Sequence, residues 1–426
     1  MSATETHRAI DAVWRIESAR LIAGLARIVR DVGIAEELAQ DALVAALEQW
    51  PEMGVPRNPG AWLMAAAKNR AIDHLRRNKR LERKHEELGA ELDAQQATAA
   101  REIVASLDDD VGDDLLSLVF TACHPVLSAE ARVALTLRLV GGLTTQEIGR
   151  AYLVSESTIA QRIVRAKRTL ADKQVPFEVP WEPELVVRLS SVLEVIYLIF
   201  NEGYLATAGD DWMRPGLSED ALRLGRVLAE LAPQQPEVHG LVALMEIQAS
   251  RFRARVGPSG EPILLMDQNR AQWDQLLIRR GFAALQRAQS LGGAAGPYVL
   301  QASIAACHAR AVTPADTDWG RIAGLYETLA QVAPSPIVEL NRAVALSMAV
   351  GPEAGLDLVD ALTAEPSLQS YHLLPSVRGD LLAKLGRQEE ARREFERAAS
   401  LTENGREREM LLELARRQVE TYPTGV

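Results

Sequence analysis

The chain has 426 residues, of which 47% are hydrophobic and 25% charged, the composition of a soluble globular protein with two to four domains. Its two cysteines exclude a disulfide framework and indicate a reducing compartment. The net charge of −11 argues against a DNA-binding protein unless the charge is segregated along the chain.

The beginning of the chain, Met1 to Arg8, is polar and lacks the apolar stretch of a signal peptide. The most apolar run, Val192 to Phe200, is far shorter than a membrane span and contains Glu194. We therefore expect a cytoplasmic protein without a membrane partner.

A basic segment extends from Pro56 to Lys84, with nine Lys or Arg residues against two acidic ones. Pro59 and Gly60 predict a break, followed by a helix from Ala61. One face of that helix is polar: Asn69, Asp73, Arg76, Arg77 and Arg80. The other face is apolar: Leu63, Ala67, Ala71 and Leu75. This density of cations favours binding to a phosphate backbone, and Asn69 suits a base edge. The alternative is a solvated charged helix.

An acidic segment follows, from Glu86 to Asp114, with ten carboxylates against one base, Arg101. Such a run is typical of a solvated linker. The three consecutive aspartates at 108–110 are better explained by this overall acidity than by a metal site.

Residues 143–170 have the pattern of a helix-turn-helix. Thr144 and Glu147 form a capping box that begins a short helix, and Ser155 suits the N-cap of the next one. That second helix has an apolar stripe: Ile159, Ile163, Ala166 and Leu170. Its opposite face is polar: Thr158, Gln161, Arg162, Arg165 and Arg168. Arg and Gln on such a face suit the DNA major groove, whereas the alternative is a helical hairpin with a solvated basic face.

The order of these basic elements resembles the bacterial RNA polymerase sigma factors of the extracytoplasmic-function class. Residues 35–50 resemble the helix that docks on the clamp of the polymerase. Trp62 and the run from Ala66 to Arg77 resemble the segment that melts and holds the −10 element, and Ser155 to Lys167 resembles the −35 recognition helix.

The resemblance implies a role for each of these regions. It implies binding of core RNA polymerase through the helix that carries Leu38, Asp41, Leu43 and Glu48, with the two leucines as its apolar surface. The loop Pro51 to Gly60 matches the −10 specificity loop, and Asn69 matches the asparagine that lines its pocket for a flipped-out base. The resemblance also implies that the acidic linker threads the RNA-exit path of the polymerase; a plain spacer is the alternative.

The character of the chain changes at Pro176 to Pro183, where four residues that break a helix or mark a boundary gather: Pro176, Pro180, Trp181 and Pro183. Amphipathic helices are predicted from there to the end, at 184–206, 217–232, 236–256, 267–291, 296–312, 318–333, 336–350, 352–364, 370–385, 388–401 and 404–421. No strand pattern is predicted in this part.

The last helices fit a 34-residue unit beginning at His372, in which small or apolar residues occupy tetratricopeptide positions: Gly379, Leu382, Gly386, Ala391, Phe395 and Ala398. This part resembles the helical, tetratricopeptide-containing extension of one group of these sigma factors. We expect it to act as a fused regulator that contacts the sigma domains or the polymerase.

No catalytic, cofactor or metal site is predicted. The Gly-rich segments 257–260 and 292–296 lack a following Gly-Lys-Ser/Thr and are interpreted as turns. Cys123 and His124 have no second pair of metal ligands elsewhere in the sequence.

We therefore predict an all-α, non-enzymatic promoter-specificity factor whose partners are core RNA polymerase and promoter DNA. Its predicted parts are a sigma domain at 1–84, an acidic linker at 85–114, a helix-turn-helix domain at 115–175 and a helical repeat extension at 184–426. The alternatives are a stand-alone helix-turn-helix regulator with a ligand-sensing repeat domain, and a repeat scaffold whose basic helices bind proteins.

Overall fold

The computed structural model describes residues 3–85, 111–152, 154–181, 184–206, 208–209, 212–258 and 260–420. The chain forms two compact units, Met1–Leu198 and Ile199–Val426. Nearly every element in the described ranges is a helix, which confirms the predicted all-α class.

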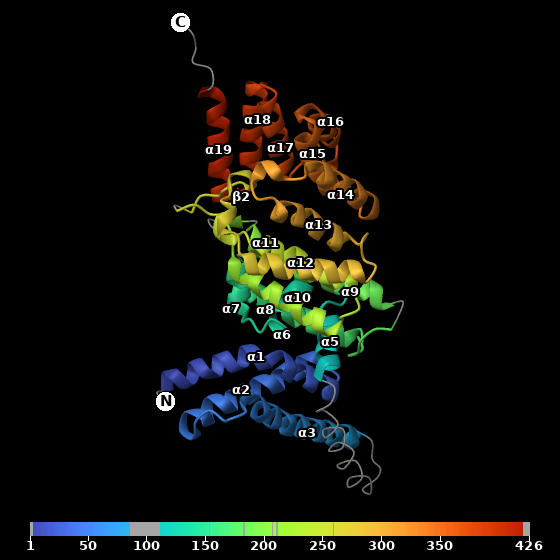
Figure 1. Cartoon of the computed structure of the whole chain (residues 1–426). Coiled ribbons are helices and arrows are strands. Elements are labelled where there is room, and N and C mark those ends of the chain that lie inside the picture. The colour runs from blue at the N-terminus through green and yellow to red at the C-terminus, as the bar shows by residue number, and fades with distance from the viewer. Residues whose placement is uncertain are drawn as a thin grey trace. The chain divides into compact units, whose positions relative to one another are not determined.

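The first unit begins with three helices that pack on one another: α1 (Ala3–Val29), α2 (Val32–Met53) and α3 (Pro59–His85), the blue elements of Figure 1. Asp31 caps α2, because its Oδ1 accepts from Gly33 N at 2.7 Å and Ile34 N at 2.9 Å. The core between these helices includes Leu25, Ala42, Trp50 and Leu63, each no more than 1% exposed.

Two boundaries in this group differ from the sequence prediction. The loop expected to begin at Pro51 is helical there, because α2 continues to Met53 and ends at Gly54, whose φ is +83°. The next helix begins at Pro59 and not at Ala61, since proline is favoured at the first helical position. Asn58 caps α3 by accepting from Ala61 N at 3.1 Å.

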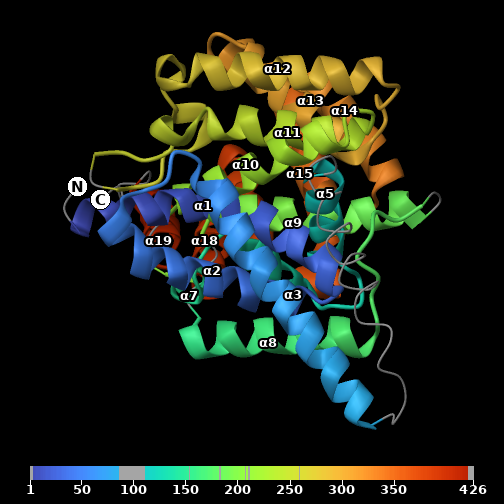
Figure 2. The ribbon, with the colours of Figure 1, turned by 90° about the horizontal axis from the view of Figure 1, so that it is seen from below.

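The same unit continues with four helices: α5 (Val111–Ala122), α6 (Ala129–Leu139), α7 (Thr145–Ala151) and α8 (Glu156–Asp172). Figure 2 shows α8 as one straight helix. The acidic linker was predicted to extend to Asp114, but α5 already begins at Val111, and Asp114 is buried with Oδ1 3.4 Å from Arg27 Nε of α1. Residues 86–110 of that linker lie outside the described ranges.

The boundary between the units falls within α9 (Glu184–Tyr204), and not at 184 as predicted. The first half of α9 packs on the helices before it. Arg188 Nη2 donates to Phe120 O at 3.0 Å, and Ser191 Oγ donates to Cys123 O at 2.7 Å. Residues 184–198 therefore belong structurally to the first unit.

The second unit consists of consecutive antiparallel helices, drawn from yellow-green to red in Figure 1. They are α10 (Pro215–Leu231), α11 (Pro236–Ala249), α12 (Gln275–Ser290), α13 (Pro297–Arg310), α14 (Trp319–Val332), α15 (Pro336–Val350), α16 (Pro352–Leu362), α17 (Leu373–Lys384), α18 (Gln388–Leu401) and α19 (Gly405–Glu420). Five short 3₁₀ turns join them: Phe252–Ala254, Leu265–Asp267, Arg270–Gln272, Pro314–Asp316 and Pro366–Leu368.

The largest departure from the predicted helices lies between α11 and α12. Helices were predicted at 236–256 and 267–291, but residues 250–258 and 260–274 form 3₁₀ turns and a loop with Gly257, Pro258 and Pro262. A further departure is a two-residue parallel pair, β1 (Ala208–Gly209) with β2 (Glu403–Asn404). Asn404 Nδ2 donates to Ala206 O at 3.1 Å beside this pair.

The predicted 34-residue repeat that begins at His372 folds as a helical hairpin of α17 and α18. Gly386 has a φ of +75° in the turn, and a Cβ on Gly379 would lie 3.0 Å from Phe395 Cε1. A larger residue would therefore strain the backbone at Gly386 and crowd Phe395 at Gly379. The predicted apolar positions Ala391, Phe395 and Ala398 are buried.

Candidate nucleic-acid interface

The helix-turn-helix of the first unit is formed by α7 and α8. Its capping box is present, because Thr144 N donates to Glu147 Oε2 at 2.8 Å and Glu147 N donates to Thr144 Oγ1 at 3.1 Å. Ser155 caps α8, with Thr158 N donating to Ser155 Oγ at 3.2 Å. Both helix starts are thus determined by local sequence.

Helix α8 has one buried side, as predicted: Ile159, Ile163, Ala166 and Leu170 are at most 5% exposed. Gln161, Arg165 and Arg168 are exposed on the other side, and Thr158 and Arg162 are half-buried. Arg168 Nε lies 3.5 Å from Asp172 Oδ2, an exposed pair that screening weakens. The unit therefore presents a row of cationic and amide side chains on a fixed helix.

The sequence reading missed Gly149, which allows the two helices to approach each other. A Cβ on this residue would lie 2.7 Å from Val154 O. A second contact closes the turn, where Thr145 Oγ1 donates to Glu156 Oε1 at 3.0 Å. A glycine within an expected helix, four residues before the turn, was the available signal.

Helix α3 carries the second predicted set of contacts. Asn69, Asp73, Arg76 and Arg77 are exposed, and Leu63, Ala67 and Ala71 are buried, as predicted, while Leu75 is half-buried. Arg77 Nε donates to Asp73 O at 3.4 Å, and Arg76 Nη1 lies 3.9 Å from Asp73 Oδ1. The side chain of Arg80 lies outside the described residues.

Trp62 is half-buried near the beginning of α3. Its ring packs edge-on against Trp50 of α2, with the ring centres 5.4 Å apart at 70°. Trp50 itself is fully buried. The Trp62 side chain is therefore only partly accessible to a partner.

The predicted polymerase-binding residues of α2 do not share one surface. Leu38 is 6% exposed and packs inward, so the expectation that it presents apolar surface is wrong. Leu43 is half-buried, and Asp41 and Glu48 are exposed. The exposed stripe of α2 has i, i+4, i+7, i+11 spacing: Glu37, Asp41, Val44 and Glu48. Val44, at 51% exposed, is the apolar side chain on this stripe.

A buried carboxylate of α2 is paired with cations of the helix-turn-helix domain. Glu36 of α2 is 3% exposed, and its Oε1 lies 2.6 Å from Arg138 Nε of α6. Its other oxygen is ion-paired with Lys167 Nζ of α8. Burial opposes ionisation, but the two cations outweigh it and lower the pKa of Glu36. We call these three residues the Glu36 cluster.

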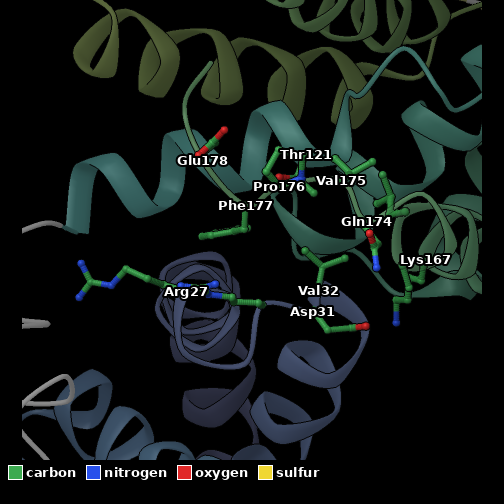
Figure 3. A pocket seen from close by; sticks show the side chains of 13 residues that line it. Arg27, Asp31, Val32, Thr121, Lys167, Gln174, Val175, Pro176, Phe177 and Glu178 are labelled. Carbon is green, nitrogen blue, oxygen red and sulfur yellow. The ribbon is translucent and has the colours of Figure 1, made fainter. Parts of the chain in front are cut away.

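A cavity of about 690 Å³ lies beside the Glu36 cluster, and Lys167, a member of that cluster, lines the cavity. Figure 3 shows its other walls: the last turn of α1 with Arg27, the N-cap of α2 with Asp31, and the segment after α8 with Phe177 and Glu178. Because its walls come from both halves of the first unit, this cavity exists only while α8 stays against α2.

The described residues contain no group of three or more His, Cys, Asp or Glu side chains arranged to hold a metal ion. Burial raises the pKa of the Cys123 thiol to about 11, so it is not a reactive thiolate at neutral pH. In the part of the chain that the structure describes, no helix has the length and apolar character needed to cross a membrane.

Comparison with known proteins assigns three stretches of the chain. Residues 16–81 match the Sigma-70 region 2 family, residues 117–170 match Sigma-70 region 4, and residues 188–289 match a family of unknown function (DUF6596). These matches coincide with α1–α3, with α5–α8, and with α9 to α12.

Three relatives illustrate the similarity. The chain is 42% identical over 384 residues to an uncharacterized protein of Rhizobium meliloti (strain 1021), covering 90% of this chain and 89% of that protein. It is 25% identical over 183 residues to the probable ECF RNA polymerase sigma factor SigI of Mycobacterium tuberculosis, covering 43% of this chain and 61% of SigI. It is 28% identical over 153 residues to the ECF RNA polymerase sigma factor SigK of Mycobacterium ulcerans, covering 34% of this chain and 75% of SigK. The chain is therefore a sigma factor with Sigma-70 region 2 and region 4 domains, similar to sigma factors of the extracytoplasmic-function class, and it carries a C-terminal helical extension.

Proposed function

We propose that this sigma factor binds core RNA polymerase and directs it to promoters by contacting the −35 element with α8 and the −10 element with α3. The observation that carries the proposal is the exposed row Gln161, Arg165 and Arg168 on a helix whose opposite stripe is buried in a helix-turn-helix. In this role the chain positions polymerase and DNA in the cytoplasm and catalyses no reaction itself.

On α8 we assign base reading to Gln161 and Arg165, because amide and guanidinium groups match adenine and guanine edges in the major groove. Thr158 and Arg162 lie at the margin of the exposed row, and we assign them supporting contacts. Arg168 lies farther along α8, beside Asp172, and we assign it to the phosphate backbone.

On α3 we assign Asn69 and the accessible side of Trp62 to the −10 bases, with Arg76, Arg77 and Arg80 on the backbone phosphates. Asp73 holds Arg76 and Arg77 in place through the contacts described above. A cationic helix of this kind binds single or melted strands with steep salt dependence.

For core polymerase we propose the exposed stripe of α2, Asp41, Val44 and Glu48, together with the half-buried Leu43. Leu38 is buried in the core and is not part of this surface. A Val44→Asp substitution tests this better than a change at Leu38, which would disturb the core.

We propose that the first unit opens when it contacts a promoter. Elements centred at −10 and −35 are about 25 base pairs apart, which is roughly 85 Å at ~3.4 Å per pair. Helix α8 has 17 residues and is therefore only about 25 Å long. The ion pair between Lys167 of α8 and Glu36 of α2 holds the −35 helix against the group of helices that carries the −10 helix. We therefore propose that promoter binding breaks the Glu36 cluster.

Transcription from a defined promoter with purified core polymerase tests the proposal. The full chain should produce a promoter-dependent transcript, and Gln161→Ala and Arg165→Ala should each weaken binding of the −35 element by about 1–3 kcal/mol at one base pair. Lys173→Gln is the matched control, because it removes a charge from an exposed residue at the C-terminal cap of α8, beyond the row. A stand-alone regulator would bind DNA without producing a transcript, and this result would overturn the proposal.

We also propose that the extension regulates the sigma domains, since an acidic chain here carries strongly basic helices. Deleting residues 199–426 leaves the first unit, including the half of α9 that packs on α5. Transcription should change several-fold, upward if the extension inhibits and downward if it tethers polymerase, while the remaining fragment still binds core. Unchanged transcription across a range of salt would contradict a regulatory role.

A further inference from the structure

The second unit holds three arginines and three aromatic residues that lie together. They come from the end of α9, the segment before α10 and the segment between α11 and α12: Tyr204, Trp212, Arg251, Arg255, Arg270 and Trp273. We call them the arginine–aromatic cluster. Tyr204, Trp212, Arg251 and Arg270 are half-buried, whereas Arg255 and Trp273 are buried, so part of the cluster faces solvent.

Cations and rings alternate through this cluster. Arg255 Cζ lies 5.9 Å from the ring centre of Trp212 and 3.6 Å from that of Tyr204. Arg251 Cζ lies 5.7 Å from the ring centre of Tyr204 and 5.7 Å from that of Trp273. Arg270 Cζ lies 5.1 Å from the ring centre of Trp273. The rings compensate the positive charge only in part, because a quadrupole attracts a cation more weakly than a carboxylate does.

Two of the arginines are anchored at helix ends. Arg255 Nη2 donates to Tyr204 O, the last residue of α9, at 3.0 Å. Arg270 Nη1 donates to His308 O at 2.6 Å and Ala311 O at 2.7 Å, at the end of α13. The partial negative charge of a helix C-terminus favours cations there. Arg251 has no such anchor, and its Nη2 donates to the Tyr204 hydroxyl.

Among the described residues, none of these three arginines forms an ion pair with a carboxylate. Other half-buried arginines of the same unit do: Arg214 pairs with Glu202, and Arg378 pairs with Asp360 and Glu394. The excess positive charge affects a neighbour, since burial together with Arg251 and Arg270 lowers the pKa of His308 to about 4. Asp316, whose field reaches Arg270, is exposed and too distant to form an ion pair.

Buried hydrogen-bond donors within the cluster also lack acceptors in the described part of the chain. Arg251 Nε, Arg270 Nε, Trp212 Nε1 and Trp273 Nε1 are buried and have no hydrogen-bond acceptor among the described residues. Trp273 as a whole is 3% exposed. Four unmatched donors beside excess positive charge favour an acceptor that is both negatively charged and rich in oxygen.

We propose that the arginine–aromatic cluster is a binding site for a small oxyanion-bearing metabolite, with a carboxylate or phosphate group as the recognised part. Arg251 makes the principal contact, because its guanidinium offers a fork of donors that no carboxylate of the protein occupies. Arg255 and Arg270, held by helix ends, position the site before the ligand arrives. The site lies largely within residues 188–289 and gives the extension a ligand to sense, independently of the promoter contacts proposed above.

Thermal unfolding of the full chain with inorganic phosphate and with citrate tests the proposal, using sodium chloride of equal ionic strength as the reference. A ligand that binds only the folded state raises Tm in proportion to its occupancy. Wild-type protein should gain several degrees with at least one probe. Calorimetric titration should show at least tenfold weaker binding for Arg251→Gln. Arg253→Gln should bind like wild type, since Arg253 is exposed and lies in the 3₁₀ turn that directly follows Arg251.

A purely structural cluster gives a different result. Without any anion, Arg251→Gln should keep or raise the Tm of the protein, because it removes an uncompensated charge, whereas a structural arginine would lower Tm when replaced. Trp273→Phe provides a second variant that keeps an aromatic ring, although a smaller one, and removes the indole N–H donor; its anion binding should be several-fold weaker. If neither phosphate nor citrate raises Tm beyond sodium chloride, or if Arg251→Gln binds like wild type, the proposal is wrong.

Discussion

Two groups of buried charge in this chain are built in opposite ways. In the first unit, Glu36 lies between Arg138 and Lys167, so each of these cations faces a carboxylate. In the second unit, Arg251, Arg255 and Arg270 face aromatic rings and backbone carbonyls, and no carboxylate of the described residues pairs with them. The first group is compensated within the protein and the second is not.

This difference separates two uses of a buried charge. A compensated pair formed by distant helices fixes how those helices meet, and breaking it leaves an unpaired ion. An uncompensated group costs stability, and such costs are commonly found at binding sites. The Glu36 cluster is therefore expected to hold the first unit closed, and the arginine–aromatic cluster to await a ligand.

The largest effect is expected from removing the carboxylate of the compensated group. Glu36→Gln leaves Arg138 and Lys167 without their counter-ion and should lower the free energy of unfolding by about 3–5 kcal/mol. Urea unfolding at pH 7 measures this, and Glu37→Gln, which changes an exposed neighbour, is the control. Equal stability of the two variants would show that the Glu36 cluster does not stabilise the closed unit.

Glu36 and His308, the histidine beside the arginine–aromatic cluster, should lose their contributions to stability at different pH. His308 has its pKa lowered from 6.5 to about 4, so its contribution is complete above pH 6.5 and is lost as the pH falls toward 4, about 3 kcal/mol in all. The pKa of Glu36 is lowered from 4.5, so its contribution is lost only below that value. His308→Gln should flatten the stability profile between pH 6.5 and 4.

Stability of the His308→Gln variant is best followed by urea unfolding at half-unit steps of pH. A second test uses Arg251→Gln. This variant removes one of the two cations that lower the pKa of His308, so that pKa should rise. A profile in which His308→Gln still loses stability between pH 6.5 and 4 would contradict the assignment.

A smaller effect separates arginines with and without a carboxylate partner in the same unit. Arg226 Nη2 lies 2.8 Å from Glu246 Oε1, and Glu246 is 3% exposed. Arg226→Gln should cost about 2 kcal/mol by leaving that carboxylate buried without its cation. Arg251→Gln should cost nothing in the absence of an anion. Equal losses in chemical unfolding would mean that the two arginines play the same structural role.

The smallest effect is expected from an exposed charge that belongs to neither group. Arg168 is 81% exposed in its side chain, so Arg168→Ala should change stability by less than about 0.5 kcal/mol. If Arg168 contacts a phosphate, the salt dependence of promoter binding should fall by about one unit of slope for every sequence. Sequence-dependent loss would instead place it among the base-reading residues.

The sequence by itself determined the elements whose signals are local. The capping box at Thr144 and Glu147, the N-cap at Ser155 and the stripe through Ile159 and Ile163 all depend on residues within a few positions of one another. Helix starts and amphipathic faces are governed by such spacings, so the helix-turn-helix and the polar face of α3 could be predicted.

Only the tertiary structure decided what depends on distant partners. Alanines such as Ala39, Ala42 and Ala45 occupy much of α2, so its hydrophobic pattern did not show which side faces inward, and Leu38 was assigned to the wrong surface. Glu36 and Arg138 are 102 residues apart, and Tyr204, Arg251 and Trp273 come from separate segments. A charge acquires its partner, or lacks one, only when the helices have packed, because local spacing carries no information about which distant side chains will share a low-dielectric interior.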